Sequence, residues 1–272
     1  MKISFPDRTT KFLRMRSKRN PIFAHRKPYQ DMTFDVTIPV LNEAPTLERQ
    51  VHILYDFLKQ HFPETGQWRI VIADNGSTDA TPDIAARLCS ELPELTLVKV
   101  PEKGVGLALK TSWGQSNADM VGYMDLDMAT DLTHFPEAYQ AIAEGDSDIV
   151  YGTRLHARSQ VIGRTLKREI ASRVFNGLLK VYLGVGFSDG MCGFKFLKRS
   201  VYQRLYENGA RNNGWFFSTE LLTISEWLGL KIFELPVKWT DDAASSKVRV
   251  VPLARRYWKD MQALKQLKFN RK

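Results

Sequence analysis

The 272-residue chain is long enough to bury a substantial core, since 43% of its residues are apolar. Its formal net charge of +9 comes from the ends, because residues 1–30 and 247–272 each carry nine Lys or Arg and one Asp. The residues between them hold 21 basic and 28 acidic side chains. Such tails are typical of adhesion to a nucleic acid or an anionic membrane leaflet, and equally of solvated, partly disordered ends.

The pattern of the chain does not indicate a disulfide framework or a zinc site, and it predicts no membrane span. Cys89 and Cys192 lie far apart and without metal-ligand spacing, which favours a reducing, cytosolic setting. The sequence has no apolar run of roughly 18 residues, and its N-terminus has no apolar signal-peptide segment. We therefore expect a cytoplasmic protein without a transmembrane helix.

From Phe34 onward, short β-branched runs alternate with segments of helical periodicity, as in parallel strands joined by crossover helices. Strands are expected at residues 34–40, 68–74, 95–100, 120–125 and 148–151. Helices are expected near residues 46–61, 79–92, 104–117 and 134–144. The sequence predicts a single α/β domain over residues 33–250, with a mostly parallel central sheet flanked by helices. A basic extension (1–32) precedes it, and a basic helix or tail (251–272) follows.

Polar side chains gather where the expected strands end, which is where open sheets of this kind bind ligands. Asp125 and Asp127 follow the fourth strand in the segment YMDLD. Mg²⁺ takes one or two carboxylates together with phosphate oxygens and water, so this pair suits a metal that bridges a diphosphate. Asp-x-Asp by itself is common in surface turns, and its place at a strand end favours the metal site.

The segment IADNGSTD ends the second strand and enters the next helix through a turn and an N-cap. The turn and the cap explain Gly76 and Ser77. They do not explain Asp74, to which we assign recognition of the ring nitrogens of a nucleotide base.

Four segments in this order resemble the successive motifs of family 2 glycosyltransferases of GT-A fold: IPVLNE (38–43), DNGSTD (74–79), KGVGLA (103–108) and DLD (125–127). The resemblance implies an inverting enzyme in which Mg²⁺ or Mn²⁺ on Asp125 and Asp127 holds the diphosphate of a sugar nucleotide. It implies that the following residues also lie along the nucleotide: Pro39, Asn42, Glu43, Asp74, Lys103 and Gly104. From the residues alone, the lysine and glycines from Lys103 onward equally open a helix.

The second half of the chain is similar to polyprenyl-phosphate sugar synthases, in YGTR (151–154), DGMCGFK (189–195), WFFSTELL (215–222) and residues 234–247. The dolichyl-phosphate β-glucosyltransferase group has the closest pattern, and dolichyl-phosphate mannose synthases come next. The resemblance covers about residues 33–260 and implies UDP-glucose as donor, with GDP-mannose as the alternative. Ala129 stands where mannose synthases often carry a glutamine, which favours glucose.

Three further residues have a role only through this resemblance. It makes Asp189 an active-site carboxylate, although a turn beside Gly190 also explains it. Glu220 lies on an otherwise apolar helix, where it faces either the donor pocket or solvent. The segment TDDAASSK (240–247) resembles a mobile lid with Lys247 on phosphate, and a flexible linker is the alternative.

Residues 154–173 carry the cations that an acceptor phosphate needs. Arg168 and Ser172 are four residues apart and share one face of a helix. By resemblance, Arg154, Arg168 and Ser172 bind the acceptor, while Arg158 and Arg164 are ascribed to a solvated face. The same helix has an apolar stripe formed by Leu166, Ile170, Val174, Leu178 and Val181. Composition alone favours a core-facing stripe, whereas the arginines and basic tails together favour a helix lying in the lipid headgroup region.

These features predict transfer of a hexose, with glucose favoured, to a polyprenyl or dolichyl phosphate by a peripheral protein on the cytoplasmic face of a membrane. A phosphate acceptor is already ionised at pH 7, so no strong general base is required. A soluble family 2 enzyme acting on a sugar hydroxyl is the alternative, and it needs Asp189 or Glu220 as base. A nucleic-acid-binding protein is the alternative of another class, but no known module is visible and the acidic body opposes it, so no nucleic acid partner is expected.

Overall fold

The computed structural model of the protein describes residues 32–64, 66–241 and 250–269. Contacts divide the chain into Met1–Gln30 and Asp31–Lys272, and all described residues belong to the second unit. Lys247 and residues 1–31 of the expected N-terminal extension lie outside the described residues.

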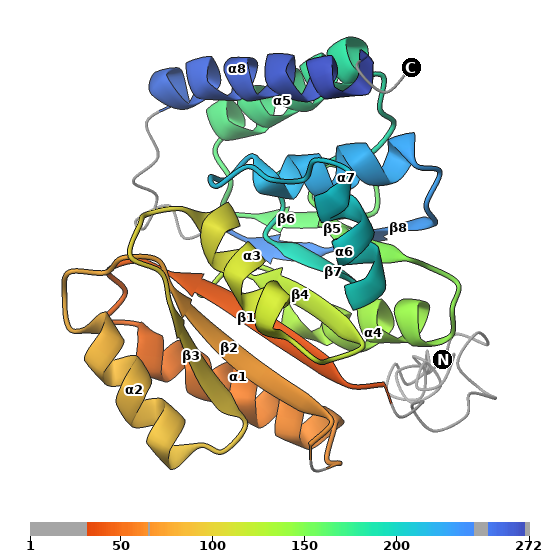
Figure 1. Ribbon diagram of the computed structural model, residues 1–272. Coiled ribbons are helices and arrows are strands. Elements are labelled where there is room, and N and C mark those ends of the chain that lie inside the picture. The colour runs from red at the N-terminus through yellow and green to blue at the C-terminus, as the bar shows by residue number, and fades with distance from the viewer. Residues whose placement is uncertain (1–31, 65, 242–249, 270–272) are drawn as a thin grey trace, which may run out of the picture. The chain divides into compact units, whose positions relative to one another are not determined.

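A twisted sheet of seven strands forms the centre of the described unit (Figure 1). Its strands lie in the order β3-β2-β1-β4-β7-β5-β8. The strand β7 runs antiparallel to both of its neighbours, and the remaining pairs are parallel. The strands are β1 (Phe34–Val40), β2 (Trp68–Asp74), β3 (Leu95–Lys99), β4 (Met120–Met124), β5 (Ile149–Thr153), β7 (Phe194–Lys198) and β8 (Ile232–Pro236). A parallel pair, β6 (Gln160–Ile162) and β9 (Lys238–Thr240), forms a second small sheet.

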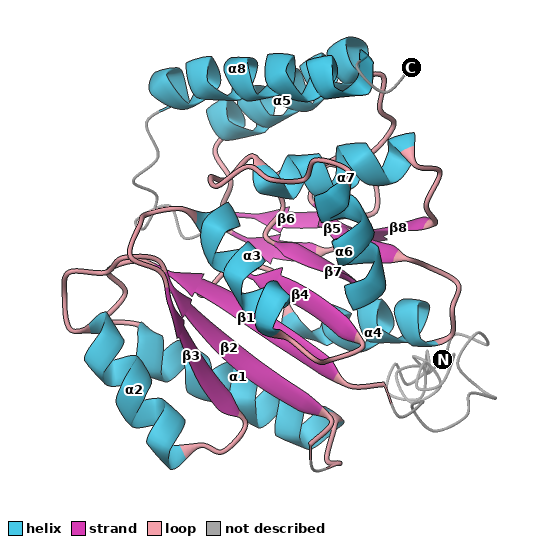
Figure 2. Cartoon of the chain, in the orientation of Figure 1, coloured by secondary structure: helices cyan, strands magenta, loops and turns pink. Residues whose placement is uncertain are grey.

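Helices cover both faces of the central sheet (Figure 2). The α-helices of the described residues are α1 (Leu47–His61), α2 (Thr81–Glu91), α3 (Val105–Gln115), α4 (Phe135–Ala143), α5 (Leu166–Leu183), α6 (Arg199–Glu207), α7 (Phe217–Trp227) and α8 (Val250–Phe269). Alternate residues of a strand point to opposite faces, so Met120 and Met124 join the core with α1 and α4, while Val121 and Tyr123 join the core with α3 and α7. The predicted α/β domain with a mostly parallel, helix-flanked sheet is confirmed.

The helix α5 turns its apolar stripe away from the core. Its buried side chains are Asn176, Leu179 and Leu183. The five stripe residues are between 47% and 88% exposed. The core-facing alternative for this stripe is therefore wrong, because the opposite face of the helix packs inward.

The helix α8 packs beside α5 through aromatic pairs (Figure 1). The rings of Tyr182 and Trp258 are 4.9 Å apart, and those of Phe175 and Tyr257 are 5.3 Å apart. Within the described part of the chain, no helix is both long and apolar enough to cross a membrane.

Candidate active site

The loops after β1 and β2 are joined by hydrogen bonds at the carboxyl edge of the sheet. The Asn42 N–H donates to Ser77 Oγ at 2.9 Å, and Asn42 Oδ1 accepts from the Thr78 N–H at 2.8 Å. The Glu43 N–H donates to Thr81 Oγ1 at 2.8 Å. Asn42 has a left-handed backbone with φ of 56°, a conformation that asparagine tolerates better than most residues. Two segments predicted to line a nucleotide are therefore adjacent.

Asp74 is the last residue of β2 and is only 4% exposed. Its Oδ1 accepts from the Ser77 N–H at 3.1 Å, so the turn fixes the carboxylate at the mouth of the strand. Pro39 lies beside it in the sheet, on β1 opposite Ala73.

The predicted segment Lys103 to Gly104 also reaches this edge. The Gly104 N–H donates to Asn75 Oδ1 at 3.3 Å, and Asn75 Nδ2 donates to the Val40 carbonyl at 2.8 Å. A Cβ at Gly104 would lie 2.4 Å from the Asn213 carbonyl oxygen, so the close approach requires glycine there. Lys103 is exposed beside this contact. The structure thus brings three of the predicted donor-side segments, after β1, after β2 and at Lys103 to Gly104, to one place.

Asp125 and Asp127 follow β4, as the sequence predicts. The Asp125 N–H donates to the Gly193 carbonyl at 3.1 Å, and a Cβ at Gly193 would come within 1.9 Å of Asp125 Oδ2. Gly193 therefore lets the backbone of a distant loop lie directly against this carboxylate. Asp127 is exposed, and its Oδ1 accepts from the Ala129 N–H at 3.0 Å.

The carboxylate pair fits a divalent cation. Burial, and next the negative charge of Asp127, raise the pKa of Asp125 to about 6, against the opposing charges of Arg154 and Lys195. A cation between the two carboxylates would offset this repulsion. Over the described residues, no three His, Cys, Asp or Glu side chains gather as a ligand set, so the other ligands would be diphosphate oxygens and water. That division of ligands is the one Mg²⁺ commonly shows.

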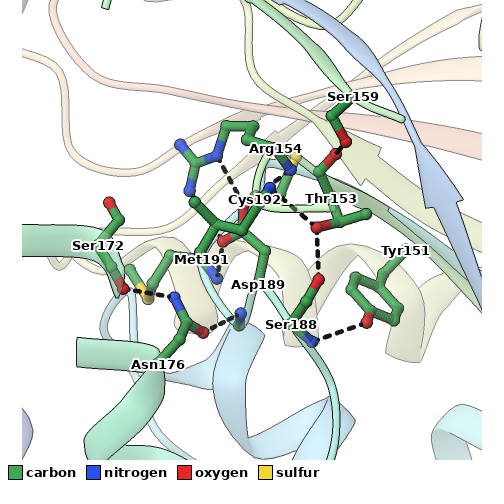
Figure 3. A network of polar contacts seen from close by, with 12 residues as sticks. Tyr151, Thr153, Arg154, Ser159, Ser172, Asn176, Ser188, Asp189, Met191 and Cys192 are labelled. Atoms are coloured by element: carbon green, nitrogen blue, oxygen red, sulfur yellow. Dashed lines mark hydrogen bonds and ion pairs between the residues drawn. The ribbon is translucent and has the colours of Figure 1, made fainter. Parts of the chain in front are cut away.

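Asp189 lies fully buried and is held by Arg154 (Figure 3). Its carboxylate accepts from Arg154 N, Nε and Nη2 at 3.1, 2.7 and 2.9 Å, and from the Met191 N–H at 3.1 Å. Burial would raise its pKa, but the Arg154 guanidinium outweighs burial and holds the pKa at about 2. The carboxylate is therefore ionised, saturated with donors and unsuited to take a proton at neutral pH.

Glu220 is buried, so the solvent-facing alternative for this residue is wrong. It is 7% exposed, and its Oε2 accepts from the Asn212 N–H at 2.7 Å. Burial raises its pKa to about 7, against hydrogen bonds from the Asn212 and Arg211 backbone and with a contribution from Asp260. Asn212 belongs to the loop whose Asn213 carbonyl lies against Gly104. Glu220 therefore supports, through this loop, the segment that begins at Lys103.

The predicted acceptor residues meet at the start of α5. Arg168 is 39% exposed and donates through Nη1 to Asp241, while Ser172 Oγ accepts from Arg164. Arg154 is 13% exposed, and its guanidinium carbon lies 5.3 Å from the ring centroid of Trp239. Its Nε and Nη2 atoms both donate to Asp189, so the edge of the guanidinium that can donate two parallel hydrogen bonds is taken by that carboxylate.

Arg164 was ascribed to a solvated face, and that interpretation is wrong. Its side chain is 5% exposed, donates to Glu169 at 2.8 Å and lies 5.9 Å from the Trp239 ring centroid. The burial depends on Trp239 in β9, which is 75 residues further along the chain, so local sequence gives no signal for it. Arg158 is exposed as expected.

Lys195 is part of the segment DGMCGFK, but the sequence assigns it no role of its own. It is fully buried on β7, where Nζ donates to the Cys192 carbonyl at 2.7 Å and the Gly190 carbonyl at 3.3 Å. Burial lowers its pKa to about 8. A single lysine within the otherwise apolar FKFL is the signal that points to it.

The features of a GT-A glycosyltransferase are present: a mostly parallel sheet with one reversed strand, and an Asp-x-Asp pair where a strand ends. In agreement, residues 35–206 match the family model "Glycosyl transferase family 2". The chain belongs to this family.

The sequence is also similar to individual glycosyltransferases. The chain is 31% identical over 217 residues to glycosyltransferase AglD of Haloferax volcanii, covering 79% of this chain and 34% of that protein. It is 29% identical over 222 residues to dolichyl-phosphate β-glucosyltransferase ALG5A of Trichomonas vaginalis, covering 78% of this chain and 68% of that protein. The ALG5C relative from the same organism is 26% identical and is covered over 65% of its length. The chain thus spans from a third to about two thirds of these relatives.

A solved structure shares the fold. Glucosyl-3-phosphoglycerate synthase from Mycobacterium tuberculosis, in complex with UDP, aligns over 89% of this chain and 86% of that chain with a TM-score of 0.61 and 21% identity. At this identity the likeness concerns the fold alone.

Proposed function

We propose that the protein transfers a hexose from a nucleoside-diphosphate sugar to a polyprenyl phosphate, with inversion at the anomeric carbon. The donor is UDP-glucose, with GDP-mannose as the alternative. The named relatives support the lipid phosphate and the glucose, since two of them are dolichyl-phosphate β-glucosyltransferases.

The pairing of Asp189 with Arg154 carries the assignment of the acceptor. A hydroxyl acceptor must lose a proton to a base whose pKa lies near the working pH. The pKa of Asp189 is held at about 2, which rules it out by this criterion. Glu220 has a pKa of about 7, but its carboxylate is buried and accepts from the Asn212 N–H, away from the proposed acceptor residues on α5. Both base candidates are thus poorly suited, whereas a phosphate needs none because it is already an anion.

On the donor side, Asp74 would accept from the base, and Asn42, Glu43 and Lys103 would border the sugar nucleotide. Asp125 and Asp127 would hold a Mg²⁺ or Mn²⁺ ion. When bound, the ion offsets the charge that develops on the departing diphosphate. The residues of the chain would hold the donor and the acceptor in line for a single displacement. Holding the two reactants in this geometry lowers the entropic cost of the reaction.

On the acceptor side, Arg168 is the cation best placed to meet a lipid phosphate. Within residues 32–64, 66–241 and 250–269, the partner of its guanidinium is Asp241, which accepts from Nη1, so the edge formed by Nε and Nη2 would donate two parallel hydrogen bonds. Ser172 lies one turn further along α5. The arginine and serine would therefore present the phosphate oxygen to the sugar from one face of this helix.

The exposed stripe of α5 supports a peripheral position on a membrane. Five apolar side chains follow one another along the helix, and Lys167, Arg173 and Lys180 are exposed around them. An apolar face bordered by cations fits an anionic lipid surface. Arg168 lies on the same helix, so a lipid phosphate in the headgroup region would reach it. We place the protein on the cytoplasmic face of the membrane.

The test is incubation of the protein with UDP-glucose or GDP-mannose, Mg²⁺ or Mn²⁺, and a polyprenyl phosphate, followed by identification of glycolipid by mass. We expect a glucosylated lipid phosphate that depends on the divalent ion. If only GDP-mannose gives a product, the donor is GDP-mannose and not UDP-glucose. If neither donor gives a glycolipid, the proposal is overturned.

A further inference from the structure

Asn176 stands out on the inner face of α5. It is 3% exposed and is the polar member of the three buried residues of this helix. Its Oδ1 accepts from the Gly190 N–H at 2.8 Å, and its Nδ2 donates to the Ser172 carbonyl at 2.9 Å (Figure 3). A backbone N–H only donates and a carbonyl only accepts, so the orientation of the amide is fixed.

The loop that Asn176 contacts is held closely on its other sides. The Gly190 carbonyl accepts from Ser218 Oγ at 3.0 Å and from Lys195 Nζ at 3.3 Å. A Cβ at Gly190 would come within 3.2 Å of Leu179 and Thr219. Gly190 therefore lies in a close fit between α5 and α7, and Asn176 supplies the polar link to α5.

The same short loop reaches both parts of the candidate active site. Next to Gly190, Asp189 holds Arg154. At the other end of the loop, the Gly193 carbonyl accepts from the Asp125 N–H and its backbone lies against the Asp125 carboxylate. A shift of this loop relative to α5 would therefore move the metal-binding carboxylate away from Arg168 and Ser172.

We propose that Asn176 is a positioning residue that keeps the acceptor-binding end of α5 aligned with the loop 189–193 and, through it, with Asp125. The inference rests on the proposed function, because it takes Arg168 and Ser172 as the acceptor side. Displacing two bound reactants by about 1 Å can cost a hundredfold in rate. Loss of the link therefore lowers kcat with both substrates saturating, while each half of the site still binds its own ligand.

The experiment compares Asn176→Leu with the wild type and with Leu183→Ala. Leucine keeps the size of the side chain and removes both hydrogen bonds. Leu183 is buried on the same face of α5, so its truncation destabilises the helix packing without touching the Gly190 link. Each variant is measured for kcat per folded molecule, UDP affinity with Mg²⁺, and hydrogen exchange of residues 188–193. If Asn176→Leu does not fold, Asn176→Ala replaces it.

We expect kcat to fall roughly ten- to hundredfold in Asn176→Leu, with UDP affinity within about twofold of the wild type and faster exchange over 188–193. Leu183→Ala should keep kcat within about twofold. Equal losses of kcat in the two variants, or loss of UDP affinity in Asn176→Leu, would overturn the inference. Failure of the wild type to form glycolipid would contradict the proposed function instead. In that case the hydrogen exchange of residues 188–193 still tests whether Asn176 holds this loop. Unchanged exchange in Asn176→Leu would show that it does not.

Discussion

Arg154 donates three hydrogen bonds to the carboxylate of Asp189, two from its guanidinium and one from its backbone N–H. The loop that carries Asp189 also contacts Asp125 of the proposed metal site through Gly193, and the charges of Arg154 and Asp189 compensate each other. The pairing leaves Asp189 unable to act as a base and takes up the bidentate edge of the Arg154 guanidinium. In the proposed acceptor site, Arg168 is therefore the cation whose bidentate edge would meet the phosphate charge.

Asp127→Ala should abolish transfer while leaving the fold intact. Asp127 is exposed in a loop, so its removal leaves no cavity, but it takes away one of two carboxylates of the proposed metal site. The measurements are initial rate at several Mn²⁺ concentrations and thermal unfolding. Asp146→Ala removes an exposed carboxylate elsewhere and should keep full activity. Wild-type rates in Asp127→Ala would remove the pair from the metal site.

Arg168→Ala should weaken use of the polyprenyl phosphate and leave UDP binding nearly unchanged. Losing a hydrogen bond to a charged group costs about 1.5 to 3 kcal/mol, roughly a ten- to hundredfold rise in apparent acceptor KM. Arg168→Lys should recover only part, because lysine lacks the bidentate fork. Arg158→Ala is the matched control, an exposed arginine of the same segment. Weaker UDP binding in Arg168→Ala, or no effect at all, would take α5 out of the acceptor site.

Glu220→Gln should stabilise the protein at pH 8 and have little effect at pH 5. Burial raises the Glu220 pKa from an ordinary 4.5 to about 7, with Asp260 adding to the shift and Lys110 opposing it. The unfolded carboxyl ionises first as pH rises, so the free energy of unfolding falls between these two pKa values and stays lower above pH 7. The shift corresponds to about 3 kcal/mol.

Thermal unfolding of Glu220→Gln and wild type across this pH range checks the expectation. Glu207→Gln alters an exposed carboxylate and should shift neither curve. A stabilisation of equal size at pH 5 and pH 8 would show that Glu220 does not titrate between them.

Val174→Asp should reduce binding to anionic vesicles. Val174 is 58% exposed in the middle of the α5 stripe, and a carboxylate there opposes both burial in the headgroup region and the lipid charge. Vesicle sedimentation measures the bound fraction. Ile53→Asp is the control, because Ile53 is an exposed apolar residue of α1. Equal loss of binding in both variants would contradict a specific role for α5.

The first half of the fold could be read from the sequence almost residue by residue. The expected strands 34–40 and 68–74 have those bounds in β1 and β2, because strand, helix and turn alternate regularly there. The reversed direction of β7 and its place between β4 and β5 were not predicted, since its partners are distant in sequence. Local periodicity carries no information about such an insertion.

The candidate site divides in a similar way. Asp74 is the last residue of β2, and Asp125 and Asp127 come directly after β4. All three could be predicted as site residues from the sequence alone. The burial of Arg164 and the pairing of Arg154 with Asp189 depend on side chains that only the tertiary fold brings together. The sequence also left open which way the apolar stripe of α5 points, because the same amphipathic pattern serves a helix on a protein core and a helix on a lipid surface.

The nature of the acceptor tests the account most directly. The measurement is the rate of glycolipid formation with a polyprenyl phosphate and with the matched polyprenol, which has the same hydrocarbon chain and a free hydroxyl. Because Asp189 is locked by Arg154, we predict product with the phosphate and none with the alcohol. Transfer to the polyprenol at a comparable rate would require a working general base and would contradict the account.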